Sequence, residues 1–225
     1  MSHELRTPLN AIIGFSDILR NERFGAVGDP RYREYAADIN DSGVHLLGII
    51  NDILDLAKID SGHASTTSET EFEVAAILES AERMVRLLAE RGKIDFVVQP
   101  PESDIRLVGV ERMVRQILVN VLSNAVKFTE PGGAVYLTTS LRNSGALVIS
   151  VKDTGIGMTP EEIKIALTPF GQADSALSRK HQGTGLGLPL AKAMMELHGG
   201  RLLVRSAPGK GTSIILVFPP ERVRA

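Results

Sequence analysis

The sequence predicts an α+β protein in which a helical hairpin over residues 1–65 precedes an α/β sandwich over residues 66–225. Two observations support this division. Apolar residues recur every three or four positions through residues 1–60, which is the period of amphipathic helices. Beyond residue 90, helical patterns mix with short segments in which apolar and polar residues alternate, as they do in sheet strands. The small polar residues at 64–70 suit a linker between the two halves.

The hairpin is expected to contain two helices joined by a turn-rich stretch at residues 24–30. The first helix runs to about Glu22, and the second begins at Pro30, since proline is tolerated in a first turn. Two helices with long apolar seams do not enclose a core by themselves. We therefore predict a homodimer through residues 1–65, in which two hairpins form a four-helix bundle. The seam of the second helix consists of Ile39, Leu46, Ile50, Ile53 and Ala57.

His3 stands at the head of the first helix but off its apolar stripe. At about 100° per residue, His3 projects away from the stripe that contains Leu9 and Ile12, and Thr7 lies on the same outer side. Glu4 is an adjacent carboxylate that can orient an imidazole or accept its proton. A solvated surface histidine is the plainer interpretation. The neighbouring groups favour a reactive one, because Pro8 adds a costly proline inside the same helix.

The second half is expected to alternate helices with strands and to place its helices on one face of a sheet. The predicted helices cover residues 74–90, 110–128 and 188–197. The predicted strands cover residues 94–98, 105–108, 134–141, 146–152, 201–205 and 212–218.

Composition excludes several classes of protein. A formal net charge of −2 with no Lys/Arg block, and only 4% aromatic residues, give no nucleic-acid footprint. The absence of cysteine removes disulfides, thiolate metal sites and cysteine nucleophiles. No apolar run approaches about 18 residues, so we expect no membrane contact by this segment and a cytoplasmic location. Because His3 follows only two residues, we expect a longer protein in which an N-terminal region, including any membrane anchor, precedes it.

Three stretches of the second half each predict part of a nucleotide site. Asn120, Asn124 and Lys127 recur at helical spacing, and amide oxygens suit Mg²⁺ while an ammonium suits phosphate. A polar helix face is the plainer interpretation of that stretch. Asp153 directly follows a predicted strand and precedes Gly155 and Gly157. Its carboxylate can accept a hydrogen bond from an amino group of a ligand, and the glycines allow the backbone to approach that ligand closely.

The third stretch is a glycine-rich run that opens a helix and exposes backbone N–H groups to an anion. It matches neither the Walker A nor the dinucleotide-binding pattern. The polar residues 168–182 before it fit a mobile lid. The candidate residues in this run are Gly183, Thr184, Gly185, Leu186, Gly187 and Leu188.

In this order, the motifs resemble those of the catalytic core of two-component sensor histidine kinases, over essentially the whole chain. Residues 2–8 resemble the phosphoacceptor H box and residues 120–127 the N box. Residues 153–157 resemble the G1 box, Pro169-Phe170 the F box and residues 183–187 the G2 box. The hairpin turn with Tyr32 and Tyr35 is similar to that of the alphaproteobacterial PleC/DivJ/PdhS-type cell-cycle kinases.

The resemblance implies an ATP-binding sandwich of the GHKL (Bergerat) type, with ATP and Mg²⁺ as cofactors. It implies that Asn124 coordinates Mg²⁺ with Asn120 nearby, and that Lys127 contacts phosphate. Asp153 would accept from the adenine amino group, with Thr212 close to it through water. The remaining cofactor-binding residues would be Gly155, Gly157, Phe170, Gly183, Thr184, Gly185, Leu186, Gly187 and Leu188.

The resemblance also implies that His3 attacks the γ-phosphate of ATP with help from Glu4, and passes the phosphoryl group to an aspartate in the receiver domain of a response regulator. Glu4 and Thr7 match the family's phosphatase signature, in which Thr7 helps to position a water. Two other hypotheses remain: a conformational ATPase of the GHKL type, and a nucleotide-binding signalling scaffold without turnover.

Overall fold

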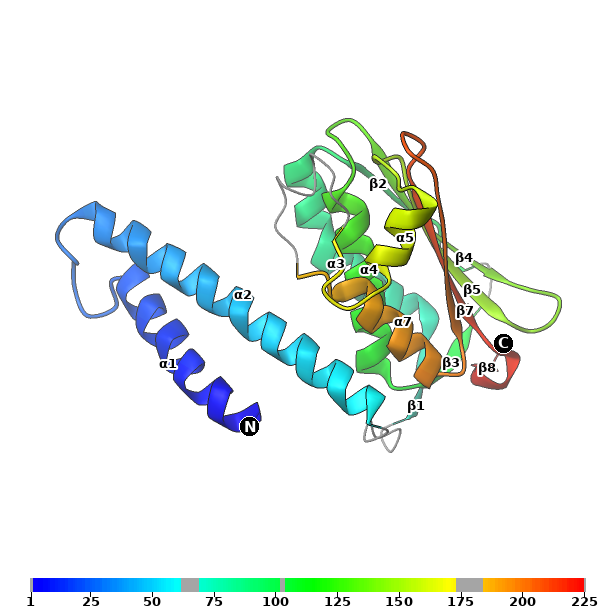
Figure 1. The fold of residues 1–225 in the computed structure, drawn as a ribbon, viewed down its shortest axis with the longest axis horizontal. Coiled ribbons are helices and arrows are strands. Elements are labelled where there is room, and N and C mark those ends of the chain that lie inside the picture. The colour runs from blue at the N-terminus through cyan, green and yellow to red at the C-terminus, as the bar shows by residue number, and fades with distance from the viewer. Residues whose placement is uncertain (1, 62–68, 102–103, 173–183, 225) are drawn as a thin grey trace. The chain divides into compact units, whose positions relative to one another are not determined.

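The computed structural model of the chain describes residues 2–61, 69–101, 104–172 and 184–224, with the side chains of residues 2–6 and 60 left aside. The chain divides into two compact units, Met1–Ala57 and Lys58–Ala225. Each unit is described by itself (Figure 1).

The first unit is the expected helical hairpin. Helix α1 spans Ser2–Arg20 and helix α2 spans Pro30–Asp60. Leu9 and Ala36 are buried between them. A polar contact also joins the helices, because the Asn40 side chain donates from Nδ2 to the Ile13 carbonyl (2.9 Å) and to Ser16 Oγ (3.1 Å). This contact fixes the register of the hairpin, since Asn40 and Ser16 are both almost fully buried.

Much of the apolar surface of the hairpin remains exposed. Ile39 and Leu46 of the predicted seam are 50% and 48% exposed, and Ile53 is 39% exposed. On α1 and in the turn, the exposed large apolar side chains are Ile12, Phe15, Leu19 and Phe24. In a single hairpin, the apolar seam therefore remains exposed to solvent. This exposure is the reason why we expect a dimer.

The second unit is built on a five-stranded sheet in the order β2-β4-β5-β7-β6. Its strands β2 and β4 are parallel, and the other neighbouring pairs are antiparallel. Helices α3, α4 and α7 cover one face of this sheet (Figure 1). The strands are β2 (Asp95–Val98), β4 (Ala134–Leu141), β5 (Leu147–Asp153), β6 (Arg201–Ser206) and β7 (Thr212–Phe218). The helices are α3 (Val74–Gly92), α4 (Glu111–Lys127), α5 (Pro160–Ala166) and α7 (Gly187–Leu197).

A second sheet of three antiparallel strands, in the order β1-β3-β8, lies at one end of this unit. Its strands are β1 (Thr70–Glu73), β3 (Arg106–Gly109) and β8 (Val223–Arg224), and the short 3₁₀ helix η1 (Pro220–Arg222) precedes β8. Beside it, Arg222 Nη1 lies 2.7 Å from Glu69 Oε1 and 3.4 Å from the Val108 carbonyl. Arg222 thereby links Glu69, which directly precedes β1, to Val108 of β3.

The core lies between the helices and the larger sheet. Inward-facing residues of β5 and β7 such as Ile149, Leu216 and Phe218 are fully buried, as are Leu118 and Leu122 of α4. Alternation along the strands and the helical period along α4 produce this burial directly. The predicted strands 134–141 and 212–218 are confirmed at both ends.

Three elements of the structure, β1, β8 and α5, are not among those predicted from the sequence. Strands β1 and β8 are short and polar, and tertiary pairing with β3 alone makes them strands. Helix α5 had a readable signal: Thr159 and Glu162 form a capping box around Pro160 in the first turn. In the described part of the chain, no helix is long and apolar enough to cross a membrane.

Candidate nucleotide-binding site

Asp153 is a buried carboxylate at the last position of β5. Its Oδ1 accepts hydrogen bonds from the backbone N–H of Gly155 (2.8 Å) and of Thr212 (3.0 Å). Burial raises the pKa of this carboxyl above its usual range, and the two backbone hydrogen bonds oppose that shift. Because these bonds occupy Oδ1, Oδ2 is the oxygen that suits a ligand amino group.

The glycines around Asp153 allow no side chain. A Cβ on Gly155 would lie 2.2 Å from the Phe128 carbonyl oxygen. Gly157 has φ +67°, and a Cβ there would lie 1.9 Å from the Ala207 carbonyl oxygen. Gly211, with φ +75°, would place a Cβ 2.0 Å from the Asp153 carbonyl oxygen. These glycines therefore allow the backbone to pack closely around the carboxylate; they are not there for flexibility.

Thr212 contacts the site through both its backbone N–H, which donates to Asp153, and its side chain. Its Oγ1 lies 2.9 Å from Ser206 Oγ, and Ser206 in turn accepts a hydrogen bond from the Met158 N–H (2.7 Å). Ser206 and Gly211 are not among the residues predicted from the sequence to form the site. The Gly209-Lys210-Gly211 turn directly before β7 was the available signal.

Helix α4 places three polar side chains at its C-terminal half. Asn120 accepts from Gln116 Nε2 (3.0 Å) and donates from Nδ2 to the Gly187 carbonyl (3.1 Å). Asn124 is half-buried, and its side chain has no hydrogen-bond partner among the described residues. Burial lowers the pKa of Lys127, whose Nζ lies 5.1 Å from the centroid of the Phe128 ring.

This arrangement fits a magnesium ion held by amide oxygen and phosphate. The described residues contain no cluster of three His, Cys, Asp or Glu side chains that could hold a metal by themselves. Asn120 already uses both ends of its amide, whereas Asn124 can turn its oxygen to an ion. Asn124 is thus the better protein ligand, with Asn120 joining α4 to α7, and phosphate oxygens would complete the shell.

The N-terminus of α7 is open to an anion. Leu186, the residue before the helix, makes no side-chain cap, and its own N–H donates to Thr184 Oγ1 (3.2 Å). Pro189 has no N–H, so the first turn presents the N–H groups of Gly187 and Leu188. The Leu186 side chain is fully buried, so its contribution to a ligand would come from its backbone. Gly183 lies outside the described residues.

Phe170 lies against the glycine-rich run. Its backbone has φ +63°, its side chain is 61% exposed, and its N–H donates to the Gly185 carbonyl (3.1 Å). Gly185 needs the absence of a side chain here, since a Cβ would lie 2.7 Å from the Phe170 carbonyl carbon. The predicted lid over 168–182 lies mostly outside the described residues, which stop at 172 and resume at 184.

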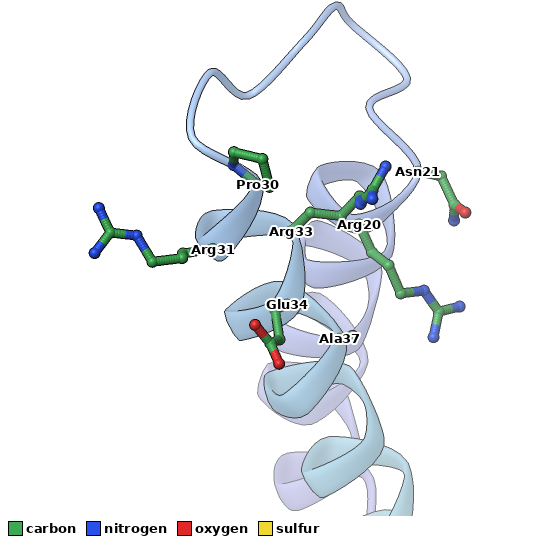
Figure 2. Close-up of a pocket in the computed structure, with 7 residues that line it drawn as sticks. All are labelled: Arg20, Asn21, Pro30, Arg31, Arg33, Glu34 and Ala37. Carbon is green, nitrogen blue, oxygen red and sulfur yellow. The ribbon is translucent and has the colours of Figure 1, made fainter.

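The predicted phosphoacceptor residues lie in the other unit. His3, Glu4 and Thr7 all belong to α1, and Thr7 is exposed. The orientations expected for His3 and Glu4 concern side chains outside the described part of the structure. Near the hairpin turn, an open pocket of about 630 Å³ is lined by residues of α1, the turn after it and α2 (Figure 2). No residue predicted to bind nucleotide or phosphate is among them: the lining residues are Arg20, Asn21, Pro30, Arg31, Arg33, Glu34 and Ala37.

Comparison with known proteins identifies the class. Residues 109–222 match the family of histidine kinase-, DNA gyrase B- and HSP90-like ATPases, and residues 1–62 match the His kinase A phosphoacceptor domain. The chain belongs to the histidine kinase family and carries both parts of its core.

Within that class, the chain resembles cell-cycle kinases. It is 42% identical over its whole length to the cell-division control histidine kinase PdhS of Brucella abortus and of Brucella suis. The chain spans 22% of the length of those relatives. It also resembles the crystal structure of full-length ShkA in complex with AMPPNP, with a TM-score of 0.80 and 31% identity over 97% of this chain and 44% of that one. Acinetobacter baumannii AdeS, at 17% identity and a TM-score of 0.68, shares the fold over 98% of both chains.

Proposed function

We propose that the chain is an ATP-dependent protein-histidine kinase that phosphorylates His3 and passes the phosphoryl group to an aspartate of a response regulator. One observation carries this proposal furthest: the hydrogen bond from Asn120 Nδ2 to the Gly187 carbonyl sets the polar face of α4 beside the open N-terminus of α7. A triphosphate on that N-terminus would lie within reach of Asn124 and Lys127. Asp153 would meanwhile accept from the adenine amino group.

The residues divide the work of phosphoryl transfer between them. His3 forms a bond from an imidazole nitrogen to the γ-phosphorus, the bond from that phosphorus to the β–γ bridging oxygen breaks, and ADP leaves. Glu4 takes the imidazole proton. Lys127, whose pKa burial lowers, would face phosphate, and a bound phosphate would favour its protonated form. Bound magnesium would neutralise charge on the phosphates, held by Asn124 with Asn120 nearby.

The same proposal covers the organisation of the chain. Residues 1–65 would form the dimerisation and phosphotransfer domain, and residues 66–225 the ATP-binding domain, with a cytoplasmic location where ATP is available. The exposed seam on α2 supports a homodimer through the first of these, because Ile39 and Leu46 are about half exposed in the single hairpin. A conformational ATPase or a nucleotide-binding scaffold would need no reactive histidine, so labelling of His3 separates these alternatives.

Incubation with γ-labelled ATP tests the kinase proposal. The wild-type chain should acquire acid-labile, base-stable label, as phosphohistidine does, and His3→Gln should acquire none. His45→Gln is the matched control, because His45 is an exposed histidine of the same unit and should leave labelling unchanged. Label that persists in His3→Gln would refute the assignment of His3.

We also propose that the chain dephosphorylates its regulator, with Thr7 positioning the attacking water. Thr7 is exposed on α1, one helical turn after His3. Thr7→Ala should lose phosphatase activity toward a phosphorylated receiver domain while it keeps autophosphorylation. Thr7→Ser retains the hydroxyl and should keep both activities. Equal loss of both activities in Thr7→Ala would show that Thr7 acts structurally.

A further inference from the structure

His198 is a buried histidine that the proposed chemistry does not use. It follows the last residue of α7 and is 2% exposed. Its Nδ1 lies 2.7 Å from the Met194 carbonyl, and its Nε2 lies 3.1 Å from the backbone N–H of Val110. Because Met194 offers only an acceptor and Val110 only a donor, the ring carries its proton on Nδ1 and accepts at Nε2.

The contact joins two helices at the end away from the nucleotide site. Val110 is the residue that precedes α4, and its N–H is one of the groups that no helical bond satisfies. His198 therefore links the beginning of α4 to the end of α7. A second contact joins the same two helices, because the Asn120 side chain near the middle of α4 donates to the carbonyl of Gly187, the first residue of α7.

The two contacts match in spacing. At about 1.5 Å per residue, Val110 and Asn120 are about 15 Å apart along α4, and Gly187 and His198 are about 16 Å apart along α7. Two antiparallel helices held at two such points have a fixed register. A slip of α7 along α4 would move the N–H groups of Gly187 and Leu188 away from Asn124.

His198 is packed closely against Gly109 and Phe218. A Cβ on Gly109 would lie 2.7 Å from His198 Cδ2, and the Phe218 ring packs edge-on with its centroid 6.3 Å away. Nearby charges come from Arg222, which disfavours a protonated imidazole, and from Glu69, which favours it. Those two side chains form an ion pair with each other at 2.7 Å.

We propose that His198 is a positioning residue for the nucleotide site: its neutral imidazole sets the register of α7 against α4 and so aligns the phosphate-binding N–H groups with Asn124. This inference rests on the proposed function, since it concerns the same site. It assigns a role to a residue that touches neither ATP nor the reacting atoms.

Protonation would break the contact, because Nε2 would become a donor facing the Val110 N–H. Burial is the main cause that lowers the pKa of His198 below its ordinary value of 6.5, so the neutral form predominates at neutral pH. Acidification should therefore weaken nucleotide binding through this residue.

Two substitutions separate the contact to α4 from the contact within α7. In His198→Gln, the amide oxygen reaches the position of Nε2 and can still accept from Val110. In His198→Asn, the shorter amide can donate to Met194 but does not reach Val110. A structural role confined to α7 predicts that both variants behave alike, or that the asparagine behaves better.

The experiment measures the affinity of the full chain for a fluorescent ATP analogue with Mg²⁺, together with KM and kcat for autophosphorylation. His198→Asn should raise Kd and KM by about tenfold, the effect of one lost buried hydrogen bond, and His198→Gln should stay within about twofold of wild type. Equal affinity in wild type and a folded His198→Asn would overturn the inference. A wild-type chain that binds the analogue but never labels His3 would instead count against the proposed function.

A pH series keeps the inference testable even where His198→Asn fails to fold. As pH is lowered below 6.5, for as long as both proteins stay folded, wild type should lose more affinity than His198→Gln, because glutamine does not titrate. Titration of the nucleotide phosphates affects both proteins equally and cancels in their ratio. Parallel profiles for the two proteins would overturn the inference.

Discussion

Replacing Asp153 separates the role that the structure shows for its carboxylate from the role that we propose for it. Oδ1 accepts hydrogen bonds from the backbone N–H groups of Gly155 and Thr212, and we propose that Oδ2 accepts from the adenine amino group. Asp153→Asn keeps an oxygen for the two backbone donors but presents an N–H₂ group to the ligand. Asp153→Ala removes both functions.

The expected magnitudes differ accordingly. The bond from the Gly155 N–H is buried and that from the Thr212 N–H is half-buried. Leaving these two donors unsatisfied in Asp153→Ala should lower the free energy of unfolding by about 2–4 kcal/mol. Asp153→Asn should cost much less, because a neutral amide avoids the burial of charge that raises the pKa of the carboxyl. Its loss should appear in nucleotide affinity, by about 10- to 100-fold, the value of a hydrogen bond to a charged group.

Thermal unfolding followed by circular dichroism measures the first effect, and titration with a fluorescent ATP analogue measures the second. Asp153→Asn should unfold close to wild type and bind weakly, whereas Asp153→Ala should be impaired in both. Equal destabilisation of the two variants would refute the role of Oδ1. Affinity of Asp153→Asn within about twofold of wild type would refute the adenine contact.

Two further predictions concern assembly and pH. Leu46→Glu should convert a dimer to a monomer, as measured by light scattering at micromolar concentration. Leu46 is 48% exposed on the α2 seam, and a charge at this position would be buried in a four-helix bundle. A wild-type chain that is monomeric at this concentration would contradict the predicted dimer. The stability of the ATP-binding unit should fall as pH decreases below 6.5, since the pKa of His198 is lowered in the folded state and the unfolded chain takes up its proton first. His198→Gln should flatten that dependence in a series of melting temperatures, and an unchanged slope would show that other groups cause it. Asp153 has the opposite sign, because its pKa is raised and its contribution to stability is lost as pH rises above 3.8.

Sequence periodicity predicted the elements that have strong local patterns. The alternation in 134–141 and 212–218 and the helical period around Leu118 and Leu122 are consequences of one buried face. Strands β1 and β8 carry no such pattern, and they exist because β3 offers backbone partners on both of its edges. Their polar composition therefore resembled a linker and a terminus.

The sequence by itself determined which residues could carry chemistry: His3 beside Glu4, a carboxylate before glycines at Asp153, and amides at helical spacing on α4. Tertiary structure decided which of those side chains are already engaged within the protein. Asn120 uses its amide to join α4 to α7, so we propose Asn124, rather than Asn120, as the ligand of a metal ion. Tertiary structure also brings His198 to Val110, so that His198 joins the same two helices. No local pattern could predict this contact, because the two residues are 88 positions apart in the sequence. A local pattern reports which face of an element is buried, whereas a hydrogen bond between distant segments depends on how the elements pack together.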